Sequence, residues 1–289
     1  MTPAMARAVP AVFVLIWATG FVLARFVAPH ADPMTFLALR CTLAACVFTL
    51  VALWARAPWP ATPRQWFNAL VAGVLMQGIY LWATFWSAKH GLPAGVIALV
   101  MGTQPLLTGV LSVPLLGERV SAQRWLGIVV GFAGALLVLF PRLGEASTAL
   151  PPMAAAVAFG GMVAMTLGTI WQKHTASASD LRTNAAVQFI GAALVLAPLA
   201  VLTEDLYLDG STEMWIGLAW GVFGLSVGAI ALLLYLIKRG AVAGVATLLY
   251  LVPPVSAIMA FFLFGETLLP IQMIGMAVAA VGVAIANRP

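Results

Sequence analysis

The stretch from Lys89 to Gly134 occurs twice in this chain, and the repetition constrains the fold more than any other feature. In each copy a charged turn opens a long apolar helix with proline at mid-length, and a Gly-Glu turn leads into a second apolar helix with spaced glycines. Two copies in one chain favour a two-fold arrangement with something held between the halves. The corresponding segments are Ala94-Gly95-Val96 and Ala243-Gly244-Val245, Pro105 and Pro254, and Gly117-Glu118 and Gly265-Glu266.

The composition places these repeats in a membrane. Hydrophobic residues make up 63% of the 289 residues and charged residues only 8%, and the mean hydropathy is +1.06. Soluble domains carry roughly a quarter of charged residues. The basic residues stand singly or in pairs near span ends, without a basic run, so the net charge of +5 does not indicate a nucleic-acid partner. A chain of this composition is expected to reside in a lipid bilayer.

Charged residues and Pro- and Gly-rich breaks divide the chain into about ten apolar spans. We expect an all-α integral membrane protein in which residues 1–146 and 147–289 form two five-helix repeats around a central cavity. The expected helices are Ala8–Ala28, Met34–Ala55, Trp66–Ala88, Pro93–Leu116, Ala122–Phe140, Pro152–Trp171, Leu181–Leu202, Met214–Ile237, Ala241–Phe264 and Pro270–Ala286.

The distribution of lysine and arginine predicts the orientation. If the N-terminus is cytoplasmic, the outer loops and ends carry only Arg25, Lys89 and Arg142, and most other basic residues fall inside. Both termini are then cytoplasmic. Because five spans per repeat is an odd number, the second repeat enters the membrane upside down relative to the first. Two inverted halves can rock about a shared site at mid-depth and open it to each side in turn.

Prolines interrupt one helix of each repeat near its middle. Pro105, Pro253 and Pro254 each remove a backbone hydrogen bond, which frees carbonyls near Met101, Leu249 and Tyr250. In hydrocarbon such carbonyls need a partner. One interpretation is that the broken helices line a cavity and offer their carbonyls to an ammonium group. The alternative is a kink that is satisfied by packing.

Polar and aromatic side chains at mid-depth form the rest of the candidate site. Amide and phenol groups that face lipid are costly, so we expect these side chains to point inward. A cavity lined by them suits an amphipathic solute, whereas the alternative is ordinary hydrogen bonding between helices. The candidates are Trp17, Gly20, Gln77, Tyr80, Thr84, Met101, Gln104 and Tyr250, beside Pro105 and Pro254.

Arg40 is the charged residue that lies well inside an expected span. As a binding residue it would meet a carboxylate or a phosphate near the outer opening. As a structural residue it would snorkel or pair with Asp32 or a helix C-terminus. Glu118 and Glu266, in the two Gly-Glu turns, are expected to pair with a neighbouring helix end or with basic residues nearby.

The sequence lacks the residues that several kinds of chemistry require. No Asp or Glu falls at mid-depth in an expected span, so a carboxylate proton relay has no obvious carrier. The sequence has no metal-ligand spacing, no P-loop, and no serine, histidine and acid that meet at one depth. We therefore expect neither a metal nor a cofactor, and no enzymatic activity.

Three short motifs resemble the EamA-type branch of the drug/metabolite transporter superfamily. They are Trp17-Ala-Thr-Gly20-Phe21, Leu39-Arg40, and Gly117-Glu118-Arg119 with its echo Gly265-Glu266-Thr267. The resemblance covers nearly the whole chain and implies a ten-helix carrier of the bacterial inner membrane, with both termini cytoplasmic and a cavity between inverted halves. The chain also resembles the branch that exports aromatic amino acids.

From these observations we expect an exporter of small metabolites that works by alternating access. Its solutes would be aromatic and other large neutral amino acids, with threonine and methionine as further candidates, and one copy of the chain would suffice for transport. The alternatives are a carrier of sugars, nucleotide-linked sugars or cationic drugs, and an integral-membrane enzyme.

Overall fold

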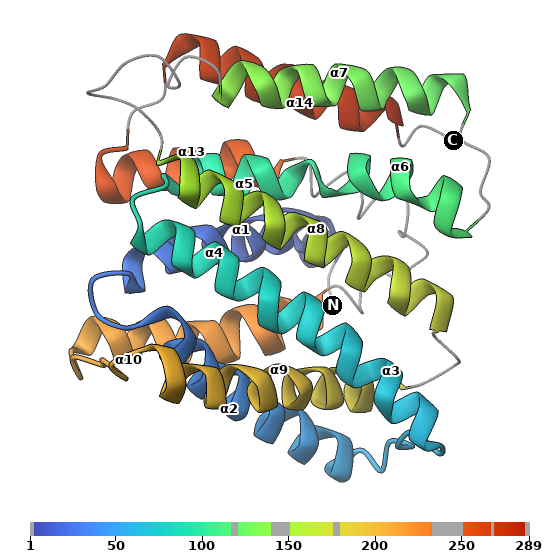
Figure 1. Cartoon of the computed structure of the whole chain (residues 1–289), viewed down its shortest axis with the longest axis vertical. Coiled ribbons are helices and arrows are strands. Elements are labelled where there is room, and N and C mark those ends of the chain that lie inside the picture. The colour runs from blue at the N-terminus through green and yellow to red at the C-terminus, as the bar shows by residue number, and fades with distance from the viewer. Residues whose placement is uncertain are drawn as a thin grey trace.

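The computed structural model describes residues 3–116, 121–139, 151–175, 180–229, 231–232, 251–266 and 269–286. It is a bundle of helices that run across the page in Figure 1. The first repeat contains α1 (Pro3–Val27), α2 (Pro33–Trp54), α3 (Pro63–Gly73), η1 (Val74–Ile79), α4 (Tyr80–Lys89), α5 (Ala94–Gly102), α6 (Gln104–Leu116) and α7 (Ala122–Leu139). The second contains α8 (Pro152–Thr175), α9 (Leu181–Thr203), α10 (Thr212–Ala219), η3 (Trp220–Gly228), α13 (Val252–Phe264) and α14 (Pro270–Ala286).

These elements form the ten expected spans, because α3, η1 and α4 are continuous, α5 and α6 are two parts of one span, and α10 continues into η3. Among the described residues, six helices are long and apolar enough to cross a membrane, and three shorter apolar helices accompany them. Most helix ends lie within a few residues of the expected ones, because local chemistry fixes them. Pro33 opens α2, and Thr62 and Gln65 form a capping box at the start of α3.

Equivalent helices of the two repeats lie side by side and run in opposite directions. Glu204, just beyond the end of α9, binds the backbone N–H of Met34 at the start of α2. Glu266, beyond the end of α13, binds the backbone N–H of Ala94 at the start of α5. At the start of α7, Gln123 contacts the end of α14. The second repeat is therefore inverted relative to the first, as the odd number of spans requires.

Glycines bring α7 and α14 into close contact, and the two helices form a layer of their own at the top of Figure 1. A Cβ atom added to Gly134 would lie 2.3 Å from the backbone nitrogen of Ala279. One added to Gly282 would lie 2.2 Å from the backbone nitrogen of Gly131. The spaced glycines of both repeats therefore serve helix packing, as small residues commonly do in membranes.

Two π-helical segments interrupt helices at equivalent positions of the repeats. In η1 the N–H of Tyr80 reaches the carbonyl of Leu75, and after η3 the N–H of Ala229 reaches that of Gly224, five residues back in each case. Each wider turn follows or includes a glycine that contacts another span. A Cβ on Gly73 would meet the backbone of Gln188, and one on Gly221 would meet Arg40. Such bulges are frequent at functional sites.

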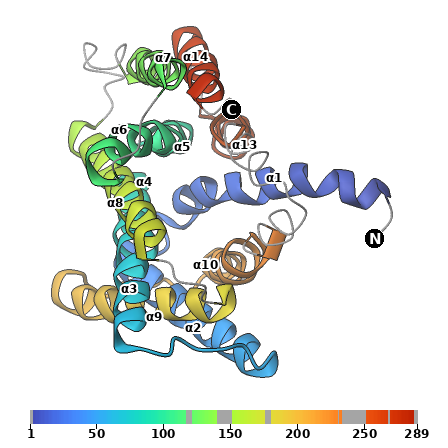
Figure 2. The same cartoon turned by 90° about the vertical axis from the view of Figure 1, so that its right-hand side faces the viewer.

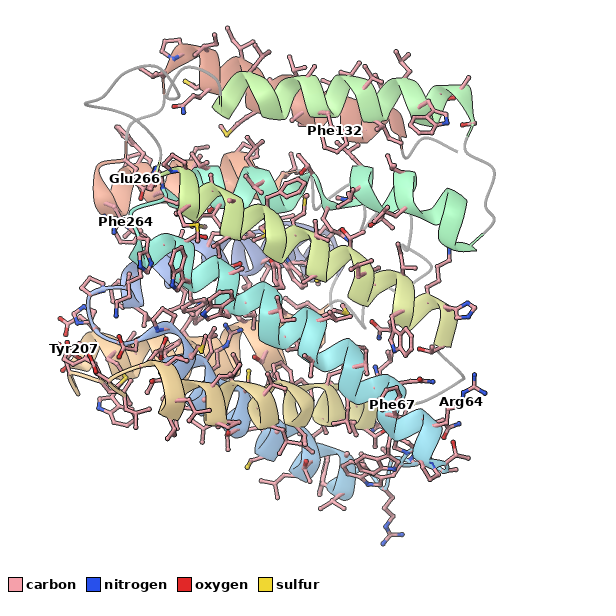
Figure 3. The ribbon with its side chains drawn as sticks, viewed as in Figure 1. Arg64, Phe67, Phe132, Tyr207, Phe264 and Glu266 are labelled. Atoms are coloured by element: carbon pink, nitrogen blue, oxygen red, sulfur yellow. The ribbon has the colours of Figure 1, made fainter. Side chains whose placement is uncertain are left out.

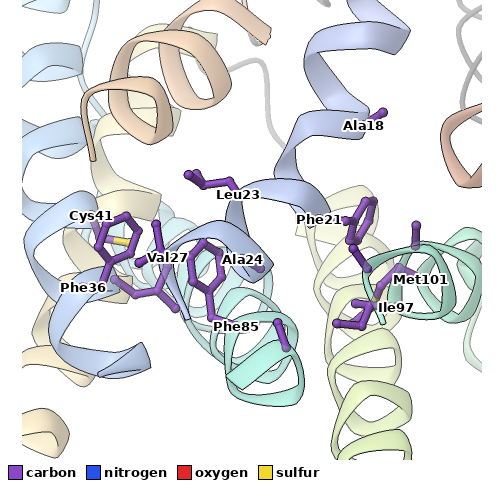
Figure 4. Packing of buried hydrophobic residues seen from close by; sticks show 14 of the residues in the cluster. Ala18, Phe21, Leu23, Ala24, Val27, Phe36, Cys41, Phe85, Ile97 and Met101 are labelled. Carbon is purple, nitrogen blue, oxygen red and sulfur yellow. The ribbon is translucent and has the colours of Figure 1, made fainter. Parts of the chain in front are cut away.

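A cluster of buried apolar side chains joins the two repeats. In the part of it shown in Figure 4, Phe36 of α2 stacks on Phe85 of α4 at a centroid distance of 5.5 Å, beside the buried Cys41. Val27 of α1 belongs to the same cluster. Figure 2 shows that α1 lies across the view, whereas several other helices are seen nearly end on. The first helix thus crosses the bundle obliquely.

The contact between α7 and α14 yields a test of the packing. Replacing Gly282 with alanine should force the two backbones apart and cost about 1–3 kcal/mol. This should lower the apparent melting temperature of the purified protein by roughly 2–10 °C. Gly160→Ala is the matched control, because a Cβ there has nothing within 4 Å. Equal melting temperatures for the two variants would contradict the close approach of the helices.

Candidate functional site

A cavity of about 250 Å³, which we call the main cavity, lies between the two repeats at mid-depth. Pockets for small ligands usually measure about 300–1,000 Å³, so this one suits a small metabolite. It contains six of the predicted residues, which come from α1, α2, η1 and α4: Trp17, Gly20, Arg40, Gln77, Tyr80 and Thr84. The second repeat contributes, among others, Met165, Gln172, Asn184, Gln188, Phe189 and Ser226.

A smaller cavity of about 70 Å³ adjoins the first, and the two share Trp17 and Tyr80. It is lined by Met101, Gln104 and Pro105, so these three predicted residues also reach the site. The Gln104 amide nitrogen approaches the hydroxyls of Thr108 (3.1 Å) and Thr169 (3.4 Å). This amide is therefore partly used in holding α6 against α8.

The helix is interrupted beside Pro105, where Thr103 separates α5 from α6. The sequence left two interpretations open: carbonyls near Met101 that are offered to a solute, or a kink that is satisfied by packing. At the neighbouring position, the Thr103 hydroxyl donates to the carbonyl of Val100 at 2.7 Å, and its backbone N–H approaches the same oxygen. One carbonyl beside the interruption is thus satisfied from within the chain.

The second interruption differs from the expectation. Pro253 and Pro254 stand in the first turn of α13, where a missing N–H costs little, and Pro254 lines neither cavity. A Cβ on Gly102 would lie 2.8 Å from Pro253, so the start of α13 packs against the interruption in the other repeat. The predicted site residue Tyr250, with the carbonyl of Leu249, lies outside the described residues.

The main cavity holds amide groups that are available to a solute. Within the described part of the chain, the side chains of Gln77, Asn184 and Gln188 make no hydrogen bonds, although all three line the cavity. Thr84, by contrast, donates to the carbonyl of Tyr80 at 2.9 Å. Uncommitted amides in an apolar wall are costly unless a ligand or water meets them.

Arg40 lies in the wall of the main cavity and is buried, with 5% of its surface exposed. Its Nε donates to the carbonyl of Gly221 at 3.2 Å, and one terminal nitrogen lies 3.5 Å from the Ser226 hydroxyl. Asp32 is not the structural partner of Arg40, because it pairs with Lys89. The structural partners of Arg40 are the Gly221 carbonyl and the Ser226 hydroxyl in the other repeat. Arg40 is the charged residue among the described residues that line either cavity.

Sequence reasoning missed the part of the site that α8, α9 and η3 supply. The repeat itself carries the signal. At the spacing that relates the two Gly-Glu turns, Trp17 corresponds to Met165 and Arg40 to Gln188, and all four residues line the main cavity. Carrying every candidate of the first repeat over to the second would have found Gln188.

One end of the bundle is closed by carboxylates that cap helices of the opposite repeat. Glu204 accepts hydrogen bonds from the backbone N–H groups of Met34 and Thr35, at 2.9 and 2.8 Å, at the start of α2. Glu266 accepts one from Ala94 at 3.0 Å and lies 3.5 Å from Arg25. Carboxylates stabilise helix N-termini through the helix dipole. Glu266 thus meets a helix end as expected, whereas Glu118 lies outside the described residues.

Further polar contacts tie the loops together at this closed end. Asp32 binds Lys89 and accepts the backbone N–H of Tyr207, and although burial opposes its charge, these bonds lower the pKa of Asp32 below the usual value. The Ser211 backbone N–H, with His30, lowers the pKa of Asp209 to about 2. Figure 3 shows Tyr207 and Glu266 at this end and Arg64 at the other.

The main cavity extends away from the closed end. Its lining continues to Gln172 near the end of α8 and to Leu181 and Asn184 at the start of α9, and Leu181 is 49% exposed. The site is therefore open toward one end of the bundle and sealed toward the other.

Two inverted repeats that meet over a cavity open to one end define a membrane transporter. The chain belongs to the EamA-like transporter family, whose sequence pattern matches residues 9–140 and again 152–288. It is a multi-pass membrane protein and a transporter, not an enzyme.

Curated relatives share about a quarter of their residues with this chain. An uncharacterized inner membrane transporter, YedA of Escherichia coli, is 25% identical over 94% of this chain and 87% of the relative. A protein named "probable amino-acid metabolite efflux pump" of Salmonella typhimurium is 24% identical over 94% and 91%. A solved crystal structure, 22% identical, matches with a TM-score of 0.67 over 96% of this chain and 95% of its own, which supports the fold alone.

The closed end generates a test of its role. Glu266→Gln removes a charge-assisted cap worth about 1–3 kcal/mol, so the population open at that end should rise roughly tenfold. Ala24 is fully buried and lies between Phe21, which lines the cavity, and Arg25 at the closed end. A cysteine at position 24, in a chain without Cys41 and Cys46, should therefore react faster with a maleimide in this variant.

Glu213→Gln is the matched control, because Glu213 is an exposed carboxylate at the same end with no hydrogen bond in the described structure. It should leave the labelling rate unchanged. If both variants labelled at the parent rate, Glu266 would not hold this end closed.

Proposed function

We propose that this protein exports amino acids with large neutral side chains from the cytoplasm by alternating access. The observation that carries the proposal is the main cavity, which combines aromatic rings with uncommitted amides and has no acidic residue among its described lining. Such a surface suits a solute with a polar end and an apolar side chain. The name of the Salmonella relative, an amino-acid metabolite efflux pump, agrees with this solute class.

The predicted residues then take two roles. Trp17 and Tyr80 contact the apolar side chain, in the space shared by the two cavities. Gln77 and Gln104, with the backbone beside Pro105, bind the polar end. The remaining candidates that line the cavities shape their walls: Gly20, Thr84 and Met101.

We place the closed end outside the cell and the open end in the cytoplasm. The distribution of lysine and arginine supports this orientation, and with it two cytoplasmic termini. The location of YedA in an inner membrane supports the same membrane for this chain. The described structure then corresponds to a form ready to receive its solute from the cytoplasm, and one copy of the chain suffices.

The charges of the site bear on coupling and on competing solutes. Because no acidic residue lines the described cavities, the solute moves down its own gradient rather than with a proton taken up by a carboxylate. The buried charge of Arg40 disfavours cationic drugs, which would have to approach an unneutralised cation. Sugars and nucleotide-linked sugars are the remaining competitors.

Flux measurements test the proposal. Purified protein in liposomes should transport labelled phenylalanine with saturation, and threonine more weakly because it fills less of the apolar space. A pH gradient should not change the rate. Trp17→Ala should lower the phenylalanine flux at least tenfold, since burying an aromatic ring is worth about 1.5–3 kcal/mol.

Gly160→Ala, away from the cavities, is the control and should transport normally. The absence of saturable flux for every amino acid would refute the solute class. A rate that requires the pH gradient would refute the coupling.

A further inference from the structure

Arg40 is held by the second repeat in a fixed position. The Cβ that Gly221 lacks would lie 3.0 Å from Cδ and 3.1 Å from Nε of Arg40, so glycine makes room for the side chain. The Gly221 carbonyl accepts both the Arg40 Nε–H and, at 3.0 Å, the Ser226 hydroxyl. We call Arg40, Gly221 and Ser226 the arginine seat.

The seat depends on the π-helical turn of η3. Gly221 and Ser226 are five residues apart, which is the spacing that a π turn brings together. Ser226 is only 2% exposed, and its hydroxyl donates to the carbonyl of Gly221, as a backbone N–H five residues on does in a π turn. The local distortion of the helix therefore fixes the guanidinium against the cavity wall.

This seat leaves the charge of Arg40 uncompensated. A guanidinium has five N–H donors, and the described contacts use two of its nitrogens, toward a carbonyl and a hydroxyl. None of the ion pairs in the described part of the chain includes Arg40. A buried cation without an anion is costly, and the cavity is the space from which an anion can reach it.

The opposite side of the cavity is neutral. The counterpart of Arg40 in the second repeat is Gln188. Its backbone packs against Gly73 just before η1, whereas Arg40 packs against Gly221 with its side chain. Gln188, Asn184 and Gln77 present amides that can accept hydrogen bonds from an ammonium group. Arg40 and Gln188 thus occupy equivalent positions in the two repeats but differ in charge.

We propose that the arginine seat binds the carboxylate of the solute, and that a free carboxylate is the feature by which this transporter selects its substrates. The inference rests on the proposed function and deepens it. A planar guanidinium matches a carboxylate with two parallel hydrogen bonds. A single cation suits a single negative charge better than a doubly charged phosphate. The ammonium group of a zwitterion is then left to the amides.

A ligand series on the unmodified protein tests this selection without any variant. Purified full-length protein is titrated with L-phenylalanine, 3-phenylpropionate, L-phenylalaninamide and glucose 6-phosphate, with thermal stability as the readout. The two carboxylates should stabilise the protein, and the amide and the phosphate should not. Equal stabilisation by phenylalanine and its amide, or stabilisation by the phosphate alone, would overturn the proposal.

Variants localise the effect. Arg40→Gln should weaken binding of phenylalanine at least about 30-fold, as loss of one partner of a buried charge pair does. Arg40→Lys keeps the charge but lacks the planar set of N–H donors, so it should retain part of the affinity for phenylalanine. Arg64→Gln is the matched control, because Arg64 lies at the opposite end from Glu266 and away from the cavities. Unchanged affinity in Arg40→Gln would overturn the seat.

The two proposals fail in different ways. If no amino acid is transported but 3-phenylpropionate still binds in an Arg40-dependent manner, the export of amino acids is wrong and the carboxylate seat stands. If phenylalanine is transported equally well by the parent and by Arg40→Gln, the seat is wrong and the export stands.

Discussion

The apolar interior of a bilayer offers no water to replace a missing backbone hydrogen bond, and the whole structure obeys that constraint. At three interruptions in the described helices, other hydrogen bonds make up part of the loss. The Thr103 hydroxyl donates to the carbonyl of Val100 between α5 and α6, and η1 and η3 shift to backbone bonds that span five residues. These interruptions lie near the middle of their spans, and residues of all three line the cavities. The places where helices deviate are therefore the places where a solute can meet polar atoms.

The same constraint shapes the closed end. Helix N-termini carry N–H groups that have no hydrogen-bond acceptor inside the helix, and here carboxylates of the opposite repeat accept these hydrogen bonds. Glu204 serves α2 and Glu266 serves α5. Because each cap crosses the boundary between the repeats, separating the repeats at that end exposes a charge and a helix dipole together. The seal is thus polar and reversible, whereas the contact of α7 with α14 is close backbone packing.

Much of this arrangement could be predicted from the sequence, because prolines, charges and glycines mark helix ends and packing faces locally. The spans and the first-repeat wall of the cavity follow from such signals. The π turns did not, since α and π hydrogen bonding differ by one residue and neighbouring helices decide between them. The partner of Arg40 was also beyond local reasoning. Asp32 is close in sequence but is occupied by Lys89, and the actual partners, Gly221 and Ser226, lie in the other repeat.

The correspondence of Arg40 with Gln188 has a consequence for the architecture itself. A homodimer built from one five-helix unit would place the same residue on both sides of its central chamber. It would hold two guanidinium groups that repel each other, or two amides and no charge at all. Joining both units in one polypeptide lets the residues on the two sides of the chamber differ, so that one side is charged and the other is neutral. An asymmetric molecule can then sit in a nearly symmetric protein in one defined direction.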